Sequence, residues 1–268
     1  MSFVIDPKRP LQDSLVMVAR SESAAALQQL QGADVTSVHQ TRKHLKRLRA
    51  WLRLLKPWLD THYPLLDRLL RDAARQLAGR RDLDVAVETL RSLRRGRQLA
   101  AEPYQQLRAA LAQMPPPVPI ATAQADARML ITAAQWYLMR LTLPPLKHAA
   151  LREALVQQRA RCQRDWQRAR AAHDAVALHD SRKSIKQLAT LQRLLAPRLS
   201  PAETETAALT ALGEQLGRHH DLYELRGLLD RLPLAGQELM KLRVRDRIDA
   251  RMAMLERDLL AHGDALFA

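Results

Sequence analysis

The feature of the sequence that most constrains its fold is an internal repeat. Residues 38–59 (VHQTRKHLKRLRAWLRLLKPWL) align with residues 178–199 (LHDSRKSIKQLATLQRLLAPRL) after a shift of 140, and ten of the twenty-two positions are identical. A shift of 139 aligns residues 77–93 with residues 216–232, and five more leucine and aspartate positions match. A repeat of this length indicates a tandem duplication, so the fold is expected to contain two similar halves.

The composition favours helices in both halves. Aromatic residues make up only 4% of the 268 residues and glycines number eight, whereas Leu, Ala, Arg and Gln are abundant. These abundant residues lose the least conformational freedom on entering a helix. We therefore predict an all-α fold with about eight to ten helices.

Proline marks the expected boundary between the halves. Residues 115–119 contain four prolines, which cannot continue a helix. The prediction is a single domain made of a first half at residues 1–118 and a second half at residues 119–268, arranged as two pseudo-symmetric four-helix bundles. Further helix boundaries are predicted before Asp82 and at Asp221, because aspartate is a good N-cap residue.

The charge balance predicts an anionic partner. Lys and Arg number 43 against 28 Asp and Glu, a formal net charge of +15. A folded polycation can meet nucleic acid, an anionic membrane surface or another polyanion. The single cysteine, Cys162, excludes an internal disulfide bond. There is no apolar stretch long enough for a membrane span and no apolar segment of signal-peptide type at the start, so a cytoplasmic location is expected.

Basic residues recur at helical spacing in both copies of the repeat. Steps of three and four residues place them on one helix face, beside an apolar stripe that includes Leu45, Leu48 and Leu52. The first stripe consists of His39, Arg42, Lys46, Arg49 and Arg53; the second consists of His179, Arg182, Lys186 and Arg193, and Lys43 and Lys183 flank the two stripes. Solubility alone does not require the same cations in two diverged copies. If the two stripes face each other, they form a positive groove suited to a linear polyanion.

Sequence motifs for catalysis are absent, and we predict a binding protein rather than an enzyme. The chain has no G-x-x-x-x-G-K-[ST] loop and no Cys/His or carboxylate pattern typical of a metal site. No cofactor and no metal are therefore expected. His39 and His179 can be structural hydrogen-bonding residues, or they can donate hydrogen bonds to phosphate at the end of each stripe. His219 and His220 are expected in a loop at a helix start.

Nucleic-acid binding is the main alternative. A phosphodiester backbone would suit the same arginines and lysines. The low aromatic content disfavours stacking of single-stranded bases, and no helix-turn-helix or zinc-finger spacing is found. Binding to a nucleic-acid backbone remains open. A membrane-surface role would require exposed apolar helix faces, which helical bundles bury, so a membrane partner is not expected.

The paired segments resemble the CHAD domain family, which is named for a conserved histidine in an α-helical domain. The resemblance rests on VHQTRKHLKRLRAWL, on its echo LHDSRKSIKQLATL and on the two Leu-x4-Asp-Leu segments that contain Asp82 and Asp221. It covers nearly the whole chain. It implies two pseudo-symmetric four-helix bundles with a basic central groove, binding of inorganic polyphosphate, and association with polyphosphate granules and their proteins.

The resemblance also implies which residues contact the ligand. These are His39, Arg42, Lys43, Lys46, Arg49, Arg53, His179, Arg182, Lys183, Lys186 and Arg193. The second copy departs from the first at two positions, where Gln187 and Ala189 replace Arg47 and Arg49. The second half is therefore expected to supply fewer cations, which makes the groove asymmetric.

Overall fold

Ten α-helices and no strand are found in the part of the chain that the computed structural model describes, which confirms the all-α prediction. That part comprises residues 3–32, 35–115, 119–172, 174–200, 202–234 and 236–267, without the side chains of residues 35 and 79–81. The helices are α1 (Leu11–Gln29), α2 (Val35–Leu59), α3 (His62–Gln76), α4 (Ala78–Arg95), α5 (Ala101–Gln113), α6 (Ile120–Arg140), α7 (His148–Ala172), α8 (Ala175–Leu199), α9 (Glu203–Leu229) and α10 (Glu238–Phe267).

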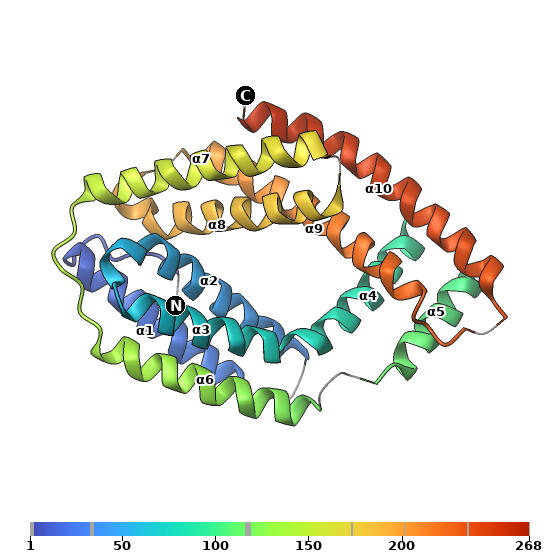
Figure 1. The fold of residues 1–268 in the computed structure, drawn as a ribbon, viewed down its shortest axis with the longest axis horizontal. Helices are drawn as coiled ribbons and strands as arrows, with labels where there is room; N and C mark the ends of the chain where they lie inside the picture. The colour runs from blue at the N-terminus through green and yellow to red at the C-terminus, as the bar shows by residue number, and fades with distance from the viewer. Residues whose placement is uncertain are drawn as a thin grey trace.

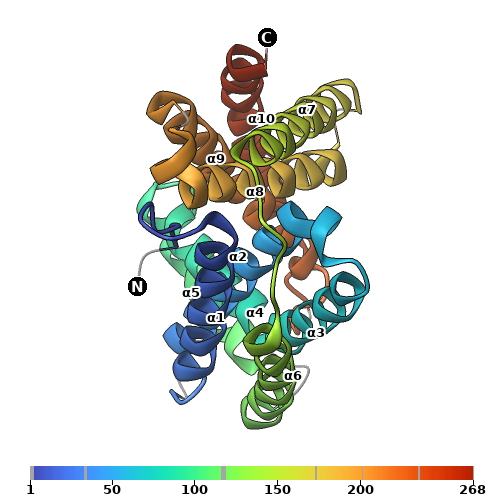
Figure 2. The ribbon, with the colours of Figure 1, turned by 90° about the vertical axis from the view of Figure 1, so that its left-hand side faces the viewer.

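The helices form two groups that meet along α2 and α8. Helices α1, α2, α3 and α6 lie on one side of the molecule, and α7, α8 and the first part of α9 lie on the other (Figure 1). Helices α4 and α5 lie beside the second part of α9 and the first part of α10 at one end. The view turned by 90° shows the same separation of the two groups (Figure 2).

Three apolar clusters hold this arrangement together. The first joins α1, α2, α3 and α6 and also takes in Leu191, Leu194 and Leu195 of α8. The second joins α4 and α5 to α9 and α10, and the third joins α7, α8, α9 and the end of α10. Helix α8 therefore packs into the cores of both groups. The predicted division into two equivalent bundles stays a prediction, and its boundary at residue 118 lies outside the described residues.

The contacts of helix α6 place it in the first group of helices. It packs against α3 and α1. Arg20 of α1 fixes the end of α6, because its guanidinium donates hydrogen bonds to the carbonyl oxygens of Leu138 at 3.0 Å and Met139 at 2.9 Å. An extended segment from residue 141 to residue 147 then leads to α7 on the other side of the molecule.

The two copies of the repeat differ where the sequence predicts a break. Helices α3 and α4 are separated at Leu77, which is also the N-cap of α4. A break before Asp82 is therefore present, but Asp82 lies inside α4 and its predicted role as N-cap is wrong. In the second copy α9 continues unbroken through Asp221, so the predicted boundary there is wrong. The physical reason is that Leu216, Leu222 and Leu225 are all buried, and their packing continues across this position.

The first residues of the chain are anchored on α8. Phe3 and Ile5 are buried in the first cluster. The backbone N–H of Ile5 donates to the carbonyl oxygen of Leu194 at 3.0 Å, and Arg198 donates to the carbonyl oxygen of Arg9 at 2.5 Å. Among the described helices, none has both the length and the apolar run that crossing a bilayer requires.

Candidate polyanion-binding groove

A groove of about 1320 Å³ lies between the two groups of helices. Side chains of α2, α4, α7, α8 and α9 line it. All eleven residues that the sequence predicts as ligand contacts are among the lining residues: His39, Arg42, Lys43, Lys46, Arg49, Arg53, His179, Arg182, Lys183, Lys186 and Arg193. The structure thus brings together both basic stripes, although their sequences lie 140 residues apart.

The groove is strongly cationic. Its lining includes fourteen Lys and Arg side chains against six Asp and Glu side chains, a net charge of +8 with histidine neutral. Five of these cations were not among the predicted contacts: Arg47, Arg161, Arg168, Arg218 and Arg231. Arg47 is partly neutralised, because it pairs with the buried Glu22 at 3.4 Å. The seven-residue spacing of Arg161 and Arg168 is a helical signal, but these residues fall outside the repeated stripe.

The cations on α2 are held in place by neighbouring helices. Arg42 donates to the carbonyl oxygen of Ala74 on α3 at 2.7 Å, and Arg49 pairs with Asp67 at 3.3 Å. Arg53 reaches across to α8 and donates to the side-chain carbonyl of Gln187 at 2.9 Å. Burial and the nearby charge of Arg49 lower the pKa of Arg53, although an arginine remains protonated. These bonds fix the positions of the charges before any ligand arrives.

The cations on α8 lie against two glycines of α9. A Cβ atom at Gly217 would lie 3.5 Å from Arg182 Nε, and one at Gly213 would lie 3.0 Å from Lys186 Cγ. A Cβ at Gly213 would therefore crowd Lys186, whereas one at Gly217 would only touch Arg182 and Lys186, and a longer side chain there would reach both cations. Burial is the main cause that lowers the pKa of both Arg182 and Lys186, and Asp221 opposes this effect.

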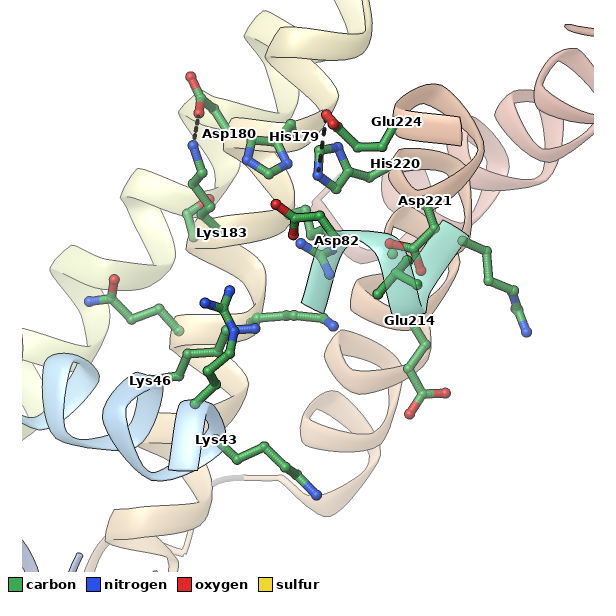
Figure 3. A pocket seen from close by; sticks show the side chains of 18 of the residues that line it. Lys43, Lys46, Asp82, His179, Asp180, Lys183, Glu214, His220, Asp221 and Glu224 are labelled. Carbon is green, nitrogen blue, oxygen red and sulfur yellow. Dashed lines mark hydrogen bonds and ion pairs between the residues drawn. The ribbon is translucent and has the colours of Figure 1, made fainter. Parts of the chain in front are cut away.

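Two histidines stack at one end of the groove. The rings of His179 on α8 and His220 on α9 have centroids 3.9 Å apart with an interplanar angle of 31° (Figure 3). Burial, followed by the charges of Lys183 and Arg182, lowers the pKa of His179. Burial and the neighbouring His179 lower the pKa of His220 to about 4. Both imidazoles are therefore neutral at neutral pH in the empty groove.

The prediction of a helix-start loop at His219 and His220 is wrong, since both lie inside α9. His219 is buried and its Nε2 lies 2.7 Å from Glu256 Oε1, which is a structural role. His220 is a further groove residue that sequence reasoning missed, besides the five arginines named above. A signal was available, because the repeat aligns His220 with Arg81, a basic position of the first copy.

Carboxylates are placed at equivalent positions of the two copies. Asp82 on α4 and Asp221 on α9 both line the groove, and they approach from different helices (Figure 3). Lys183 pairs with Asp180 at 2.8 Å on the exposed rim. Within the described residues, no group of three or more His, Cys, Asp or Glu side chains is arranged to hold a metal ion.

Comparison with known proteins agrees with the resemblance seen in the sequence. The CHAD domain family matches residues 18–230. The structure is similar to the crystal structure of the CHAD domain from the plant Ricinus communis, with a TM-score of 0.68 and 19% identity over 99% of this chain and 94% of that one. It is also similar to PptA from Streptomyces chartreusis, with a TM-score of 0.63 and 17% identity over 97% of this chain and 98% of that one. No curated protein matches the sequence significantly. Because the family match spans most of its length, the chain belongs to the CHAD domain family.

Proposed function

We propose that this protein binds inorganic polyphosphate in the groove, without turnover, and that this binding brings it to polyphosphate granules in the cytoplasm. The observation that carries the proposal is the convergence of both basic stripes on one cavity with a net charge of +8. Like charges held this close repel one another unless an anion lies between them. Family membership supports the choice of polyphosphate as that anion.

The chemistry of the lining suits a linear chain of phosphates. Arginine offers a planar fork that donates two hydrogen bonds to phosphate oxygens, and lysine supplies a compact charge. Arg42 is held by its bond to Ala74 of α3 and Arg182 packs beside Gly217 of α9, so these two arginines are proposed to set the geometry of the contact. Lys43 and Lys183 are exposed on the rim and chiefly raise the local potential. Groups of this kind hold phosphate rather than cleave it, which is why turnover is not part of the proposal.

The proposal extends to the architecture. The two groups of helices on either side of the groove would be the two pseudo-symmetric four-helix bundles of the duplication. The similar pairing of helices in the two groups supports this. In one group α1 packs against α2 and α3 against α6, and in the other α7 packs against α8 and α9 against α10.

Binding to a nucleic-acid backbone is the second candidate, because the same cations would neutralise phosphodiesters. One observation weighs against single-stranded nucleic acid. The described residues that line the groove include no Phe, Tyr or Trp on which bases could stack. This argument does not weigh against binding of duplex DNA, whose bases are already stacked.

The experiment is a competition assay. Fluorescent long-chain polyphosphate is bound at about 150 mM salt and then displaced by single-stranded RNA, duplex DNA or short phosphates. We expect unlabelled long-chain polyphosphate to compete far better than the other three. Equal displacement by RNA or DNA would overturn the assignment in favour of a general polyanion-binding protein.

A pair of matched variants locates the binding. Lys43→Gln/Lys183→Gln removes two exposed lysines at equivalent positions in the groove. Lys8→Gln/Lys147→Gln removes two exposed lysines outside it and serves as the control. We expect only the first variant to weaken polyphosphate binding, by about three- to tenfold, as suits two solvent-exposed charge contacts. Equal weakening in both variants would contradict binding in the groove.

A further inference from the structure

Helix α7 supplies cations to the groove that the repeat does not account for. Arg161 and Arg168 lie two turns apart on the same face, both are exposed, and both line the groove. Asp165 lies between them on that face. The groove thus has a cationic wall that belongs to neither basic stripe.

Arg161 and Arg168 make few ion pairs or hydrogen bonds with the described part of the protein. Arg161 makes an i,i+4 pair with Asp165 at 3.7 Å, a separation at which an exposed pair contributes little. Arg168 makes no hydrogen bond or ion pair with the residues that the structure describes. Their side chains are therefore available to an anion from outside.

The α7 arginines lie close enough to the predicted contacts to act with them. The charge of Arg161 contributes to the lowered pKa of Arg53 on α2, after burial and the nearby Arg49. The charge of Arg168 contributes to the lowered pKa of Asp180 on α8, for which the bond from Lys183 is the main cause. Arginines of α7 and the cations of α2 and α8 therefore share one region of positive potential.

The wall formed by α7 has no counterpart in the first half. At the shift of 140 that aligns the basic stripes, Arg161 corresponds to Ser21 and Arg168 to Gln28 on α1, and neither lines the groove. The second copy of the repeat also has the buried Gln187 and Ala189 where the first has Arg47 and Arg49, and Arg49 is a member of the first stripe. Arg161 and Arg168 of α7 thus supply positive charge to the wall of the groove where α8 has fewer cations than α2.

We propose that Arg161 and Arg168 form an additional anion-binding segment, continuous with the groove, that holds the part of a long polyphosphate chain extending beyond α2, α8 and α9. This inference rests on the proposed function and adds that the groove binds long polyphosphate chains more tightly than short ones. A short phosphate bound by Arg182 and Lys186 would make no contact with α7. A long chain would make additional contacts with Arg161 and Arg168 of α7.

The test compares two double variants of α7. Arg161→Gln/Arg168→Gln removes the groove-lining pair, and Arg152→Gln/Arg164→Gln removes two exposed arginines of the same helix that do not line the groove. Affinity for long-chain polyphosphate and for tripolyphosphate is measured at several salt concentrations. Thermal unfolding of each variant checks that the fold is intact.

We expect the groove-lining variant to bind long chains about three- to tenfold more weakly, with unchanged affinity for tripolyphosphate. Its log–log salt slope should fall by about 1.4, because each phosphate contact contributes about 0.7 for a single-stranded polyanion. The control should keep the slope of the unmodified protein. An unchanged slope in the groove-lining variant, an equal loss in the control, or an equal loss for tripolyphosphate would each overturn the inference. A failure of the unmodified protein to bind polyphosphate would instead overturn the proposed function.

Discussion

At the scale of single residues, the stacked pair His179 and His220 is the most pH-sensitive part of the groove. The pKa values of both imidazoles are lowered, with burial as the main cause and the cations of α8 adding to it. Glu224 is a weak opposing influence, with Oε1 at 3.9 Å from His220 Nε2. A bound polyanion would supply negative charge next to the pair and raise both pKa values.

Polyphosphate affinity should therefore rise as the pH falls. At a pH where both imidazoles are neutral in the complex as well as in the empty groove, affinity does not depend on pH. At lower pH the complex takes up protons before the empty groove does, in which the pKa of His220 is about 4 and the pKa of His179 is also lowered. We expect a gain of about tenfold between pH 7 and pH 5, since one linked proton gives at most tenfold per unit.

The measurement is a binding titration across this range on three proteins. His179→Gln/His220→Gln should flatten the profile. His262→Gln, which removes an exposed histidine that contacts Gln215 and does not line the groove, should leave the profile unchanged. A profile that is flat in the unmodified protein, or equally steep without the pair, contradicts this role.

The basic stripes could be predicted from the sequence, whereas the histidine pair could not. His39, Arg42 and Lys46 share a face because helical spacing is a local property. The contact between His179 and His220, which are 41 residues apart in the chain, depends on how α8 packs on α9. Spacing carries no information about such a contact.

At the scale of helices, the notable feature of α9 is a glycine beside the cations of α8. Gly217 lies in the interior of a helix, where glycine costs about 1 kcal/mol relative to alanine. A Cβ here would lie in ordinary van der Waals contact with Arg182 and Lys186, with Lys186 Nζ at 3.8 Å, so a longer side chain would enter the space that the two cations occupy. Helix stability is thus lowered at a position where a large side chain would meet these cations.

Filling that space should weaken binding. Gly217→Leu would displace Arg182 and Lys186, and we expect about tenfold lower affinity for polyphosphate, the equivalent of one lost charge-assisted hydrogen bond. Gly227→Leu is the matched control, because nothing lies within 4 Å of a Cβ there. Affinity is measured by titration and helicity by circular dichroism. Unchanged affinity in folded Gly217→Leu would show that the two cations do not need this position.

The break between α3 and α4 shows the limit of repeat-based prediction for helix boundaries. The segment with Leu-x4-Asp-Leu occurs in both copies, yet only the first copy is interrupted, at Leu77. In the second copy the buried His219 bonds to Glu256 of α10, and this contact supports a continuous helix. The first copy has Arg80 at the aligned position. Tertiary contacts, rather than the shared motif, decide where the helix ends.

At the scale of the whole molecule, the groove stores electrostatic repulsion in the empty protein. Fourteen cations against six carboxylates line one cavity. Self-repulsion of this kind destabilises the compact state, and a ligand that binds only the folded state stabilises it. The repeat and its two basic stripes are visible in the sequence. That the two stripes face one cavity depends on the crossing of α2 and α8, where Arg53 bonds to Gln187.

Thermal unfolding should report this repulsion. At a ligand concentration of about 100 times Kd, polyphosphate should stabilise the fold by about 2.7 kcal/mol and raise Tm by about 5 °C or more. Added sodium chloride should raise Tm of the empty protein by screening the same charges.

The lysine variants provide the control for this experiment. Lys43→Gln/Lys183→Gln should raise Tm of the empty protein and reduce the shift caused by polyphosphate, because it removes charge from the groove. Lys8→Gln/Lys147→Gln changes the net charge equally and should do neither. A Tm that responds to neither salt nor polyphosphate would contradict stored repulsion.

The anchoring of the first residues on α8 has a consequence for how the chain folds during synthesis. The bond from Arg198 to the backbone of Arg9 spans 189 residues, so the binding site of the N-terminal segment is made long after the segment itself. Until α8 emerges from the ribosome, Phe3 and Ile5 have no surface of that helix to pack against. Contacts between such distant parts of a chain form slowly, and exposed apolar residues favour aggregation meanwhile. The contacts of residues 5 and 9 with α8 are thus among the last to form, and a translational pause before α8 would prolong the time during which they are missing.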